Sequence, residues 1–191
     1  KFSKVKNLKK LSCMFLMVLM ATAVWGQKVD MDVFKNMEAR PIGPAGMSGR
    51  ITAIDVVQSN PQIIYAGAAS GGLWRSTSGG LDWEPLFDDQ EVLGIGAIAI
   101  DQNNPDVIYV GTGEGNPRNS VSSGYGLYKT IDGGDTWELL GLEETRSIHR
   151  IIIHKDDPNT VYIGAIGSPW GATPDRGLWR TKDGGKTFEH I

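Results

Sequence analysis

The stretch KTIDGGDTW, residues Lys129–Trp137, decides how the rest of the chain is interpreted. It places two acidic residues, Asp132 and Asp135, around a pair of glycines and ends on a tryptophan. A short acid in a hairpin turn can accept hydrogen bonds from backbone N–H groups, and glycines allow positive φ there. The aromatic side chain can then bury a large apolar area between sheets. The motif therefore predicts a structural turn between two strands, with Asp135 as a solvated turn residue.

The same motif occurs three times. RSTSGGLDW (Arg75–Trp83) and RTKDGGKTF (Arg180–Phe188) repeat it, and the closing aromatics recur at intervals of 54 and 51 residues. Before each copy come an apolar run, a proline turn, a tyrosine-containing strand and a Gly-Leu-aromatic-basic segment. The proline turns are expected at Asn60-Pro61, Asn104-Pro105 and Asp157-Pro158. Four short strands in each unit predict an all-β fold, a β-propeller, because a sandwich of unrelated hairpins would not explain the ordered recurrence.

We expect three four-stranded blades, at about 49–88, 94–141 and 147–191. Propellers close with roughly four to eight blades, so the sequence is interpreted as a fragment that holds the first three blades of an incomplete ring. The segment 27–48, extending to Gly49, is expected to supply an outer strand that closes the last blade.

The first 26 residues are typical of a signal peptide. Five lysines precede an apolar run from Leu11 to about Val24, and small residues at Ala21, Ala23 and Gly26 suit a signal peptidase. The apolar run is short for a membrane span, so we expect cleavage rather than an anchor. The mature protein is therefore expected to be secreted, periplasmic or at the cell surface, with no membrane insertion.

Charge and composition narrow the function classes. The whole chain carries −3, and residues 1–26 carry five lysines and no acid, which leaves −8 on the remainder. An acidic exported domain is a poor binder of nucleic acid, so no nucleic-acid partner is expected. The only cysteine, Cys13, lies in the signal segment. His149 and His154 are expected on opposite faces of a strand, so neither a metal nor a cofactor is predicted.

The glycine motif resembles the Asp-box pattern, Ser/Thr-x-Asp-x-Gly-x-Thr-Trp, of sialidase-like, xyloglucanase-like and sortilin-type propellers. The second copy fills the pattern, the third has Phe188 in place of tryptophan, and the first has Ser78 in place of the acid. Ser78 supports a structural role, because a serine can cap a turn but cannot replace a catalytic carboxylate. The residues assigned this structural role are Ser76, Gly80, Trp83, Thr130, Asp132, Gly134, Thr136, Trp137, Thr181, Asp183, Gly185, Thr187 and Phe188.

Residues 40–191 together resemble exported bacterial propellers that are grouped with the sortilin N-terminal domain and often labelled glycosyl hydrolase-like. The resemblance rests on RPIGPAGMSGRI, GAASGGLWRS, YVGTGEGNPRNSVSSGYGLYKT and GLWRTKDGGKTF. It implies a binding or interaction module for peptide, protein or glycan ligands. A glycoside hydrolase is the alternative implied by the same families, and a purely architectural propeller is a third possibility.

The candidate binding residues come from the loops that vary in length. Proline turns and glycine motifs fall on one face of the blades, and the irregular loops fall on the other, where binding residues usually gather. Arginine with asparagine and an acid could grip a carboxylate, a sugar or a peptide terminus. No catalytic residue is assigned, although three arginines could match a sialidase-like triad. The ligand-binding candidates are Arg50, Glu114, Asn116, Arg118, Asn119, Ser120, Trp170 and Arg176.

Overall fold

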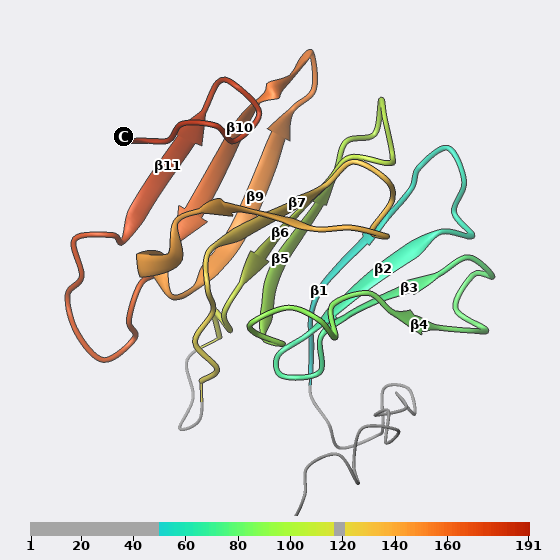
Figure 1. Ribbon diagram of the computed structural model, residues 1–191, viewed down its shortest axis with the longest axis horizontal. Helices are drawn as coiled ribbons and strands as arrows, with labels where there is room; N and C mark the ends of the chain where they lie inside the picture. Colours follow the sequence, from blue (N-terminus) through green and yellow to red (C-terminus); the bar gives the residue numbers. More distant parts are fainter. Residues whose placement is uncertain (1–49, 117–120) are drawn as a thin grey trace, which may run out of the picture. The chain divides into compact units, whose positions relative to one another are not determined.

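The computed structural model describes residues 50–116 and 121–191, which lie within one compact unit, Pro41–Ile191. Figure 1 shows three antiparallel sheets that follow one another along the chain. Blade one holds β1 (Ile51–Val56), β2 (Ile64–Ala68), β3 (Leu73–Ser76) and β4 (Glu84–Pro85). Blade two holds β5 (Ile95–Ile100), β6 (Ile108–Thr112), β7 (Leu127–Thr130) and β8 (Glu138–Gly141). Blade three holds β9 (Ile148–His154), β10 (Asp157–Ala165), β11 (Gly177–Thr181) and β12 (Glu189–His190).

The predicted all-β fold with about three four-stranded blades is confirmed. Each sheet pairs its strands in sequence order, and one 3-10 helix, Glu143–Thr145, joins blades two and three. Two expectations, the signal peptide at 1–26 and the closing strand at 27–48, lie outside the described residues.

The third proline turn differs from its expected position. In blades one and two the loop bends at Asn60 and Asn104, each of which donates its backbone N–H to a carbonyl three residues earlier. In blade three, His154 pairs directly with Asp157, so Asp157-Pro158 already belongs to β10 and the hairpin bends at residues 155–156. An irregularity in the β9–β10 register, between Asp157 and Val161, accommodates the tighter bend.

The turns between the third and fourth strands, residues 76–83, 130–137 and 181–188, are here named the Gly-Gly turns. In the second of them the Thr130 hydroxyl accepts a hydrogen bond from Gly134 N (3.0 Å). The Asp132 carboxylate accepts from Thr130 Oγ1 (2.6 Å), Thr136 N (2.9 Å) and Thr136 Oγ1 (2.5 Å). Positive φ at Gly133 and Gly134, 74° and 106°, closes the turn.

The first Gly-Gly turn keeps this geometry without its acid. Ser76 Oγ accepts from Gly80 N (2.8 Å), and Ser78 Oγ accepts from Asp82 N (2.9 Å), where Asp132 serves in the second turn. The first glycine of each Gly-Gly turn also donates to a carbonyl of its own blade. In blades one and two the acceptor lies in the proline turn, as for Gly133 N and Asp106 O (3.0 Å), and in blade three it is Asn159 O of β10 (2.9 Å).

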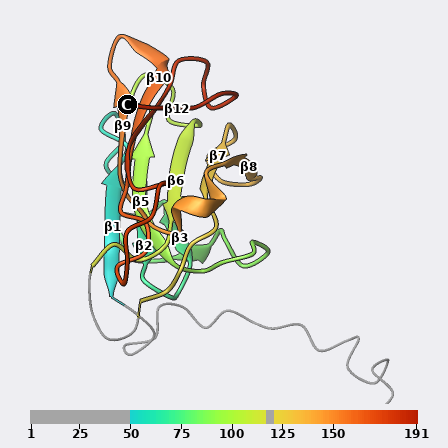
Figure 2. The same ribbon diagram turned by 90° about the vertical axis from the view of Figure 1, so that its left-hand side faces the viewer.

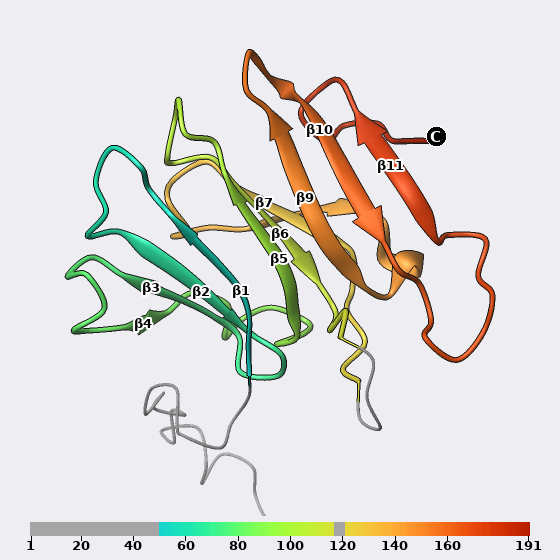
Figure 3. The ribbon, with the colours of Figure 1, turned by 180° about the vertical axis from the view of Figure 1, so that it is seen from behind.

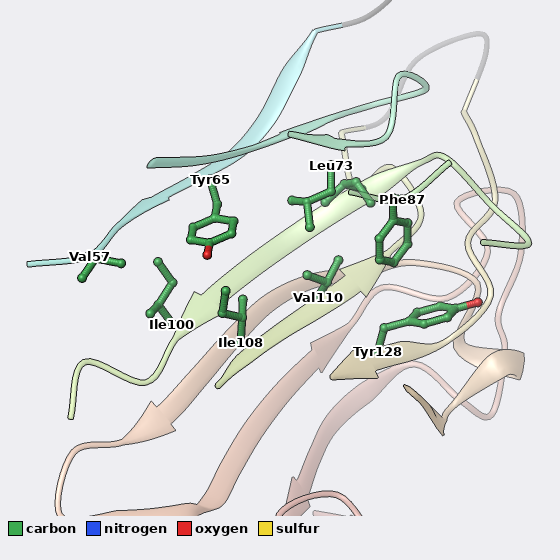
Figure 4. Close-up of a cluster of buried hydrophobic side chains, with 9 residues drawn as sticks. Val57, Tyr65, Leu73, Phe87, Ile100, Ile108, Val110 and Tyr128 are labelled. Carbon is green, nitrogen blue, oxygen red and sulfur yellow. The ribbon is translucent and has the colours of Figure 1, made fainter. Parts of the chain in front are cut away.

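Apolar side chains between neighbouring blades form the core. Figure 4 shows the cluster between blades one and two, in which Phe87 from the loop after β4 packs edge-on against Tyr128 at 5.1 Å. Trp137 of the second Gly-Gly turn packs against the same Phe87, also at 5.1 Å. Blade two has neighbours on both sides, which explains why every residue of β6 is buried. The side chains that make up the first cluster are Val57, Tyr65, Leu73, Phe87, Ile95, Ile100, Ile108, Val110 and Tyr128.

Hydrogen bonds join each blade to the Gly-Gly turn of the next blade. Tyr65 Oη and Arg75 Nη1 of blade one both donate to Gly133 O, each at 2.8 Å. Arg75 also pairs with the carboxylate of Asp135 (3.2 Å), so the expectation that Asp135 is only a solvated turn residue is wrong. Its side chain is exposed but binds a neighbouring blade.

The second interface repeats the pattern. Tyr109 Oη and Lys129 Nζ of blade two donate to Gly184 O at 3.2 and 3.0 Å. Burial raises the pKa of Tyr109 to about 12, so its hydroxyl stays a proton donor. The Gly-Gly turns therefore fasten blades to one another as well as strands within a blade.

The first strands of the three blades lie side by side, as Figure 3 shows for β1, β5 and β9. In the side view of Figure 2, the strands of blade two run from β5 to β8 away from these inner strands. Each inner strand has a bulge at the same place, at Thr52, Gly96 and His149. These inner strands and the irregular loops beside them are the surfaces on which a ligand can meet several blades at once.

Candidate functional site on the loop face

The loop face is the side of the blades opposite the Gly-Gly turns. Its loops are tied to the beginnings of the inner strands by backbone hydrogen bonds. Ala69 N donates to Arg50 O (2.9 Å) and Gly113 N to Gly94 O (2.7 Å). Each irregular loop thus begins from backbone that is held by the neighbouring strands. This attachment can keep binding residues of the loop in place.

Arg50 and Glu114 form an ion pair across the interface between blades one and two. The Arg50 guanidinium contacts Glu114 Oε1, and the Glu114 side chain is 2% exposed whereas that of Arg50 is 42% exposed. A buried carboxylate needs such a partner, because an unpaired charge in that position is costly. The structure therefore brings these two candidates together and leaves Arg50 as the member that solvent can reach.

Ser147 links the backbone of Glu114 to blade three. Its hydroxyl donates to Glu114 O at 3.0 Å, and its backbone carbonyl accepts a hydrogen bond from Ile166 N at 2.9 Å. The neighbouring Arg146 has a left-handed backbone, with φ of 58°, and its carbonyl accepts from Gly124 N at 2.7 Å. Such strain in a non-glycine residue is held by surrounding contacts and is common at binding sites.

A hollow of about 70 Å³ lies between the loops of blades two and three. Trp170 is at its rim with 73% of its surface exposed, and Arg146 lines it from the loop before β9. This volume fits a group the size of a carboxylate or hydroxymethyl, since water in the liquid occupies about 30 Å³. The hollow is lined by Val121, Ser123, Arg146, Ser147, Gly167, Ser168, Pro169 and Trp170.

Arg176 supports the loop that carries Trp170. Its Nε donates to Ile166 O (2.6 Å), and its Nη2 donates to Ser168 O (2.7 Å) and Gly171 O (3.1 Å). Three of its hydrogen bonds are therefore made within its own loop. Its assignment as a ligand contact stays a prediction, and its observed role is to shape the loop.

Of the four remaining candidate residues, one lies within the part of the chain that the structure describes and three do not. Asn116 is exposed at the beginning of the long blade-two loop. Arg118, Asn119 and Ser120, which the sequence also assigned to ligand binding, lie outside the described residues.

A second concave surface runs along the inner strands. A groove of about 460 Å³ is lined by β1, β5 and β9, and His149 and Arg150 are its exposed polar side chains. Thr52 and Asp55 in this groove are already bound, because Thr52 Oγ1 donates to Ile95 O (2.6 Å) and Asp55 Oδ2 accepts from Ile100 N (3.0 Å). The sequence placed His149 among the loop residues of the variable face and argued against its sharing a metal with His154, but did not place it in a groove. The alignment of His149 with Thr52 and Gly96 in the repeat would have placed it in the groove.

Within 50–116 and 121–191, no group of three or more His, Cys, Asp or Glu side chains is placed to hold a metal ion. No helix in that part of the chain is long and apolar enough to span a membrane.

Comparison with solved structures gives the fold an independent check. No protein-family model matches the chain, and no curated protein matches it. An ancestral GH74 enzyme is similar over 74% of this chain and 18% of its own, with a TM-score of 0.59 and 21% identity. YCF48 from Cyanidioschyzon merolae is similar over 77% of this chain and 41% of its own, with a TM-score of 0.52 and 17% identity.

YCF48 bound to the D1 peptide is also similar, over 75% of this chain and 40% of its own, with a TM-score of 0.52 and 15% identity. The chain thus spans less than half the length of each of these proteins. Identities this low establish a shared fold and leave function open. The chain is built as part of a β-propeller.

Proposed function

We propose that this chain is part of a ligand-binding propeller of the Asp-box class, and that a peptide, protein or glycan binds on the loop face. The observation that carries the proposal is the exposed Trp170 beside the hollow lined by Arg146. A large exposed aromatic next to a guanidinium is a common anchor for ligands.

The chemistry of the hollow suggests how such a ligand is held. A carboxylate, for example at a peptide terminus or on an acidic sugar, would fit the small volume and pair with Arg146. The apolar face of a sugar or an aromatic side chain would stack on Trp170. The structural likeness to YCF48 bound to a peptide supports a peptide as one such ligand.

Screening with and without the tryptophan tests this proposal. The full chain is applied to peptide and glycan arrays, and the affinity of each hit is measured for wild type, Trp170→Ala and Ile131→Ala. Ile131 is a matched control, because it is 70% exposed on the opposite face, in a Gly-Gly turn. We expect Trp170→Ala to weaken binding about 10- to 100-fold and Ile131→Ala to leave it unchanged. Equal affinity of wild type and Trp170→Ala would refute this site.

Export is the second part of the proposal. The lysine-rich, apolar segment of residues 1–26 supports secretion or transfer to the periplasm or cell surface. Sequencing of the exported protein is expected to find its N-terminus after Ala23 or Gly26. Retention of the segment in the exported protein would contradict cleavage.

Glycoside hydrolysis is the alternative, and the similarity to a GH74 enzyme supports considering it. Incubation with a glycan panel and measurement of released reducing ends would detect it. Hydrolysis should then be lost when one Asp or Glu of the loop face is changed to Asn or Gln. If hydrolysis persists in every such variant, the catalytic residues do not lie in this part of the chain.

A further inference from the structure

Arg75 and Lys129 take the same position in successive blades. Each lies in the third strand of its blade, opposite an acid of the fourth strand, Glu84 for Arg75 and Glu138 for Lys129. Each also donates to the first-glycine carbonyl of the next Gly-Gly turn. Beside each of them is a crevice between the fourth strand of one blade and the Gly-Gly turn of the next, here named the first and the second crevice.

In the first crevice the basic residue is neutralised by two carboxylates. Arg75 Nε donates to Glu84 Oε1 at 2.6 Å, and both Nη atoms of Arg75 lie 3.2 Å from Asp135 Oδ1. The Arg75 side chain is 19% exposed, so these pairs hold a mostly buried guanidinium. The crevice has a volume of about 280 Å³.

In the second crevice a lysine replaces one of these acids. Lys186 follows the second glycine of its turn, as Asp135 does in the turn before. Lys129 Nζ donates to Gly184 O at 3.0 Å and lies 5.1 Å from the centre of the Tyr109 ring. Among the residues that the structure describes, neither lysine forms an ion pair with a carboxylate. The second crevice therefore brings together two cations at a place where the first has a cation and an anion.

The half-buried ammonium of Lys129 stands to gain from an anion. Burial is the largest influence on its pKa and lowers it, Glu138 raises it, and Lys186 lowers it further. A cation that has lost part of its hydration and has no anionic partner is costly, so binding of an anion relieves this cost.

The two acids that line the second crevice leave room for such an anion. The Asp183 carboxylate is turned into its own Gly-Gly turn, where it accepts four hydrogen bonds at 2.6 to 2.9 Å. Glu138 stands where Glu84 stands, and in the first crevice Arg75 binds a second carboxylate in addition to Glu84. An acid in the fourth strand is thus compatible with a further carboxylate on the basic residue.

The second crevice is also large enough for more than one ionic group. Its volume is about 510 Å³, within the range of about 300–1,000 Å³ that is usual for small-molecule sites. Leu139 and Asn159 line it beside the charged residues, so the body of a ligand would meet an apolar wall and an amide.

We propose that the second crevice binds a small ligand through one carboxylate, which pairs with Lys129 and Lys186 and takes the place that the Asp135 side chain has in the first crevice. A singly charged carboxylate suits the site better than a phosphate, because Glu138 and Asp183 would repel a higher negative charge. Both walls of the crevice belong to blades two and three. The site is separate from the ligand site of the proposed function, which lies on the loop face.

A titration with glucuronate tests this site, since glucuronate combines one carboxylate with the body of a sugar. Backbone amide shifts of the isotope-labelled full chain are followed by NMR at constant ionic strength. We expect saturable shifts at Gly184, Gly185 and Lys186, and none with glucuronamide, which lacks the charge. Absence of saturable shifts, or equal shifts with glucuronamide, would overturn the proposal. Tighter binding of inorganic phosphate than of glucuronate would overturn the choice of a carboxylate.

Lys186→Asp supplies the second crevice with a carboxylate of its own. The affinity for glucuronate should fall about tenfold or more, because the new side chain competes for Lys129. Lys155→Asp is the matched control, because it makes the same change of charge at a side chain that is 85% exposed in the hairpin bend of blade three. Affinity that is unchanged in Lys186→Asp, or equally reduced in both variants, would contradict the site.

Exchanging the two residues should move the site. Asp135→Lys/Lys186→Asp keeps the net charge of wild type, frees Arg75 from one carboxylate and gives one to Lys129. Glucuronate should then shift the amides of Gly133 and Gly134 in place of those of the second crevice. Trp170→Ala should bind glucuronate as wild type does, which separates this site from the one on the loop face. Shifts that stay in the second crevice after the exchange, or that are lost in Trp170→Ala, would refute the assignment.

Discussion

The carboxylates of Asp132 and Asp183 act on their own turns. Asp183 accepts hydrogen bonds from Thr181 Oγ1, Lys186 N, Thr187 N and Thr187 Oγ1 at 2.6 to 2.9 Å. Such bonds favour the charged form, and they hold the pKa of both carboxyls well below the usual value for aspartate. For Asp132 the largest cause is the Thr130 hydroxyl, and for Asp183 it is the Thr187 hydroxyl. A group that stays ionised in this way is poorly suited to donate a proton.

These depressed pKa values predict how stability depends on pH. In the unfolded chain the two carboxyls protonate near pH 4, whereas in the folded chain they stay charged at lower pH. Their contribution is therefore complete above about pH 4 to 5 and is lost as pH falls toward the folded pKa. Urea unfolding between pH 6 and 2.5 should show a steeper loss for wild type than for Asp132→Asn/Asp183→Asn. Parallel curves for the two proteins would contradict this role.

The Gly-Gly turn is an element that tolerates the loss of its acid. In the first turn the Ser78 hydroxyl accepts one backbone hydrogen bond, from Asp82 N at 2.9 Å, and pairs with Ser76 Oγ at 3.4 Å, whereas Asp132 accepts three hydrogen bonds in the second turn. Asp82 stands where Thr136 stands and supplies no hydroxyl. The turn keeps its shape because Ser76 and the two glycines still form the core of the motif.

Rebuilding the motif in blade one should therefore stabilise the protein. We expect Ser78→Asp/Asp82→Thr to raise the free energy of unfolding by about 0.5–1.5 kcal/mol, the usual net contribution of a hydrogen bond. Ser78→Asp alone should gain less, because the new carboxylate faces Asp82. Urea denaturation at pH 7 measures all three proteins, and a double variant no more stable than wild type would count against the interpretation.

The strands and turns could be predicted from the sequence because they recur in each repeat. The contacts between repeats could not be predicted. The repeat located the strands, the Gly-Gly turns and the face on which the loops vary. It misjudged Asp135, because the partner Arg75 comes from a different repeat, 60 residues away in the chain. For the same reason the pairing of Arg50 with Glu114 could not be foreseen. The sequence also does not show that the Arg176 guanidinium donates hydrogen bonds to three backbone carbonyls of its own loop.

At the scale of the whole molecule, stability depends on close approach between blades. Blade two is buried on both sides, and the glycines of the second strands allow the neighbouring inner strand to approach. Stability in such arrays is approximately a sum of terms from single repeats and from the interfaces between neighbours. A substitution that weakens one interface should therefore lower the stability of the whole array.

Gly111→Ala tests this dependence. Its methyl group would overlap Ile148 of blade three, so we expect a loss of about 1–3 kcal/mol in the free energy of unfolding. Gly164→Ala introduces the same methyl group in ordinary contact with Arg150, at 3.4 Å, and Gly171→Ala introduces it in open space, so both should change stability little. Denaturant unfolding of the three variants gives the comparison, and equal stabilities would contradict packing of the blades through these glycines.

The contacts between blades also have a direction along the chain. Tyr65 and Arg75 precede the Gly133 carbonyl that they bind, and Tyr109 and Lys129 precede Gly184. Because a polypeptide is synthesised from its N-terminus, the donors of each blade are complete before the acceptor of the next blade emerges. A newly made Gly-Gly turn therefore meets donors that have already been synthesised. The order of synthesis is thus also the order in which the partners of each interface become available to pair.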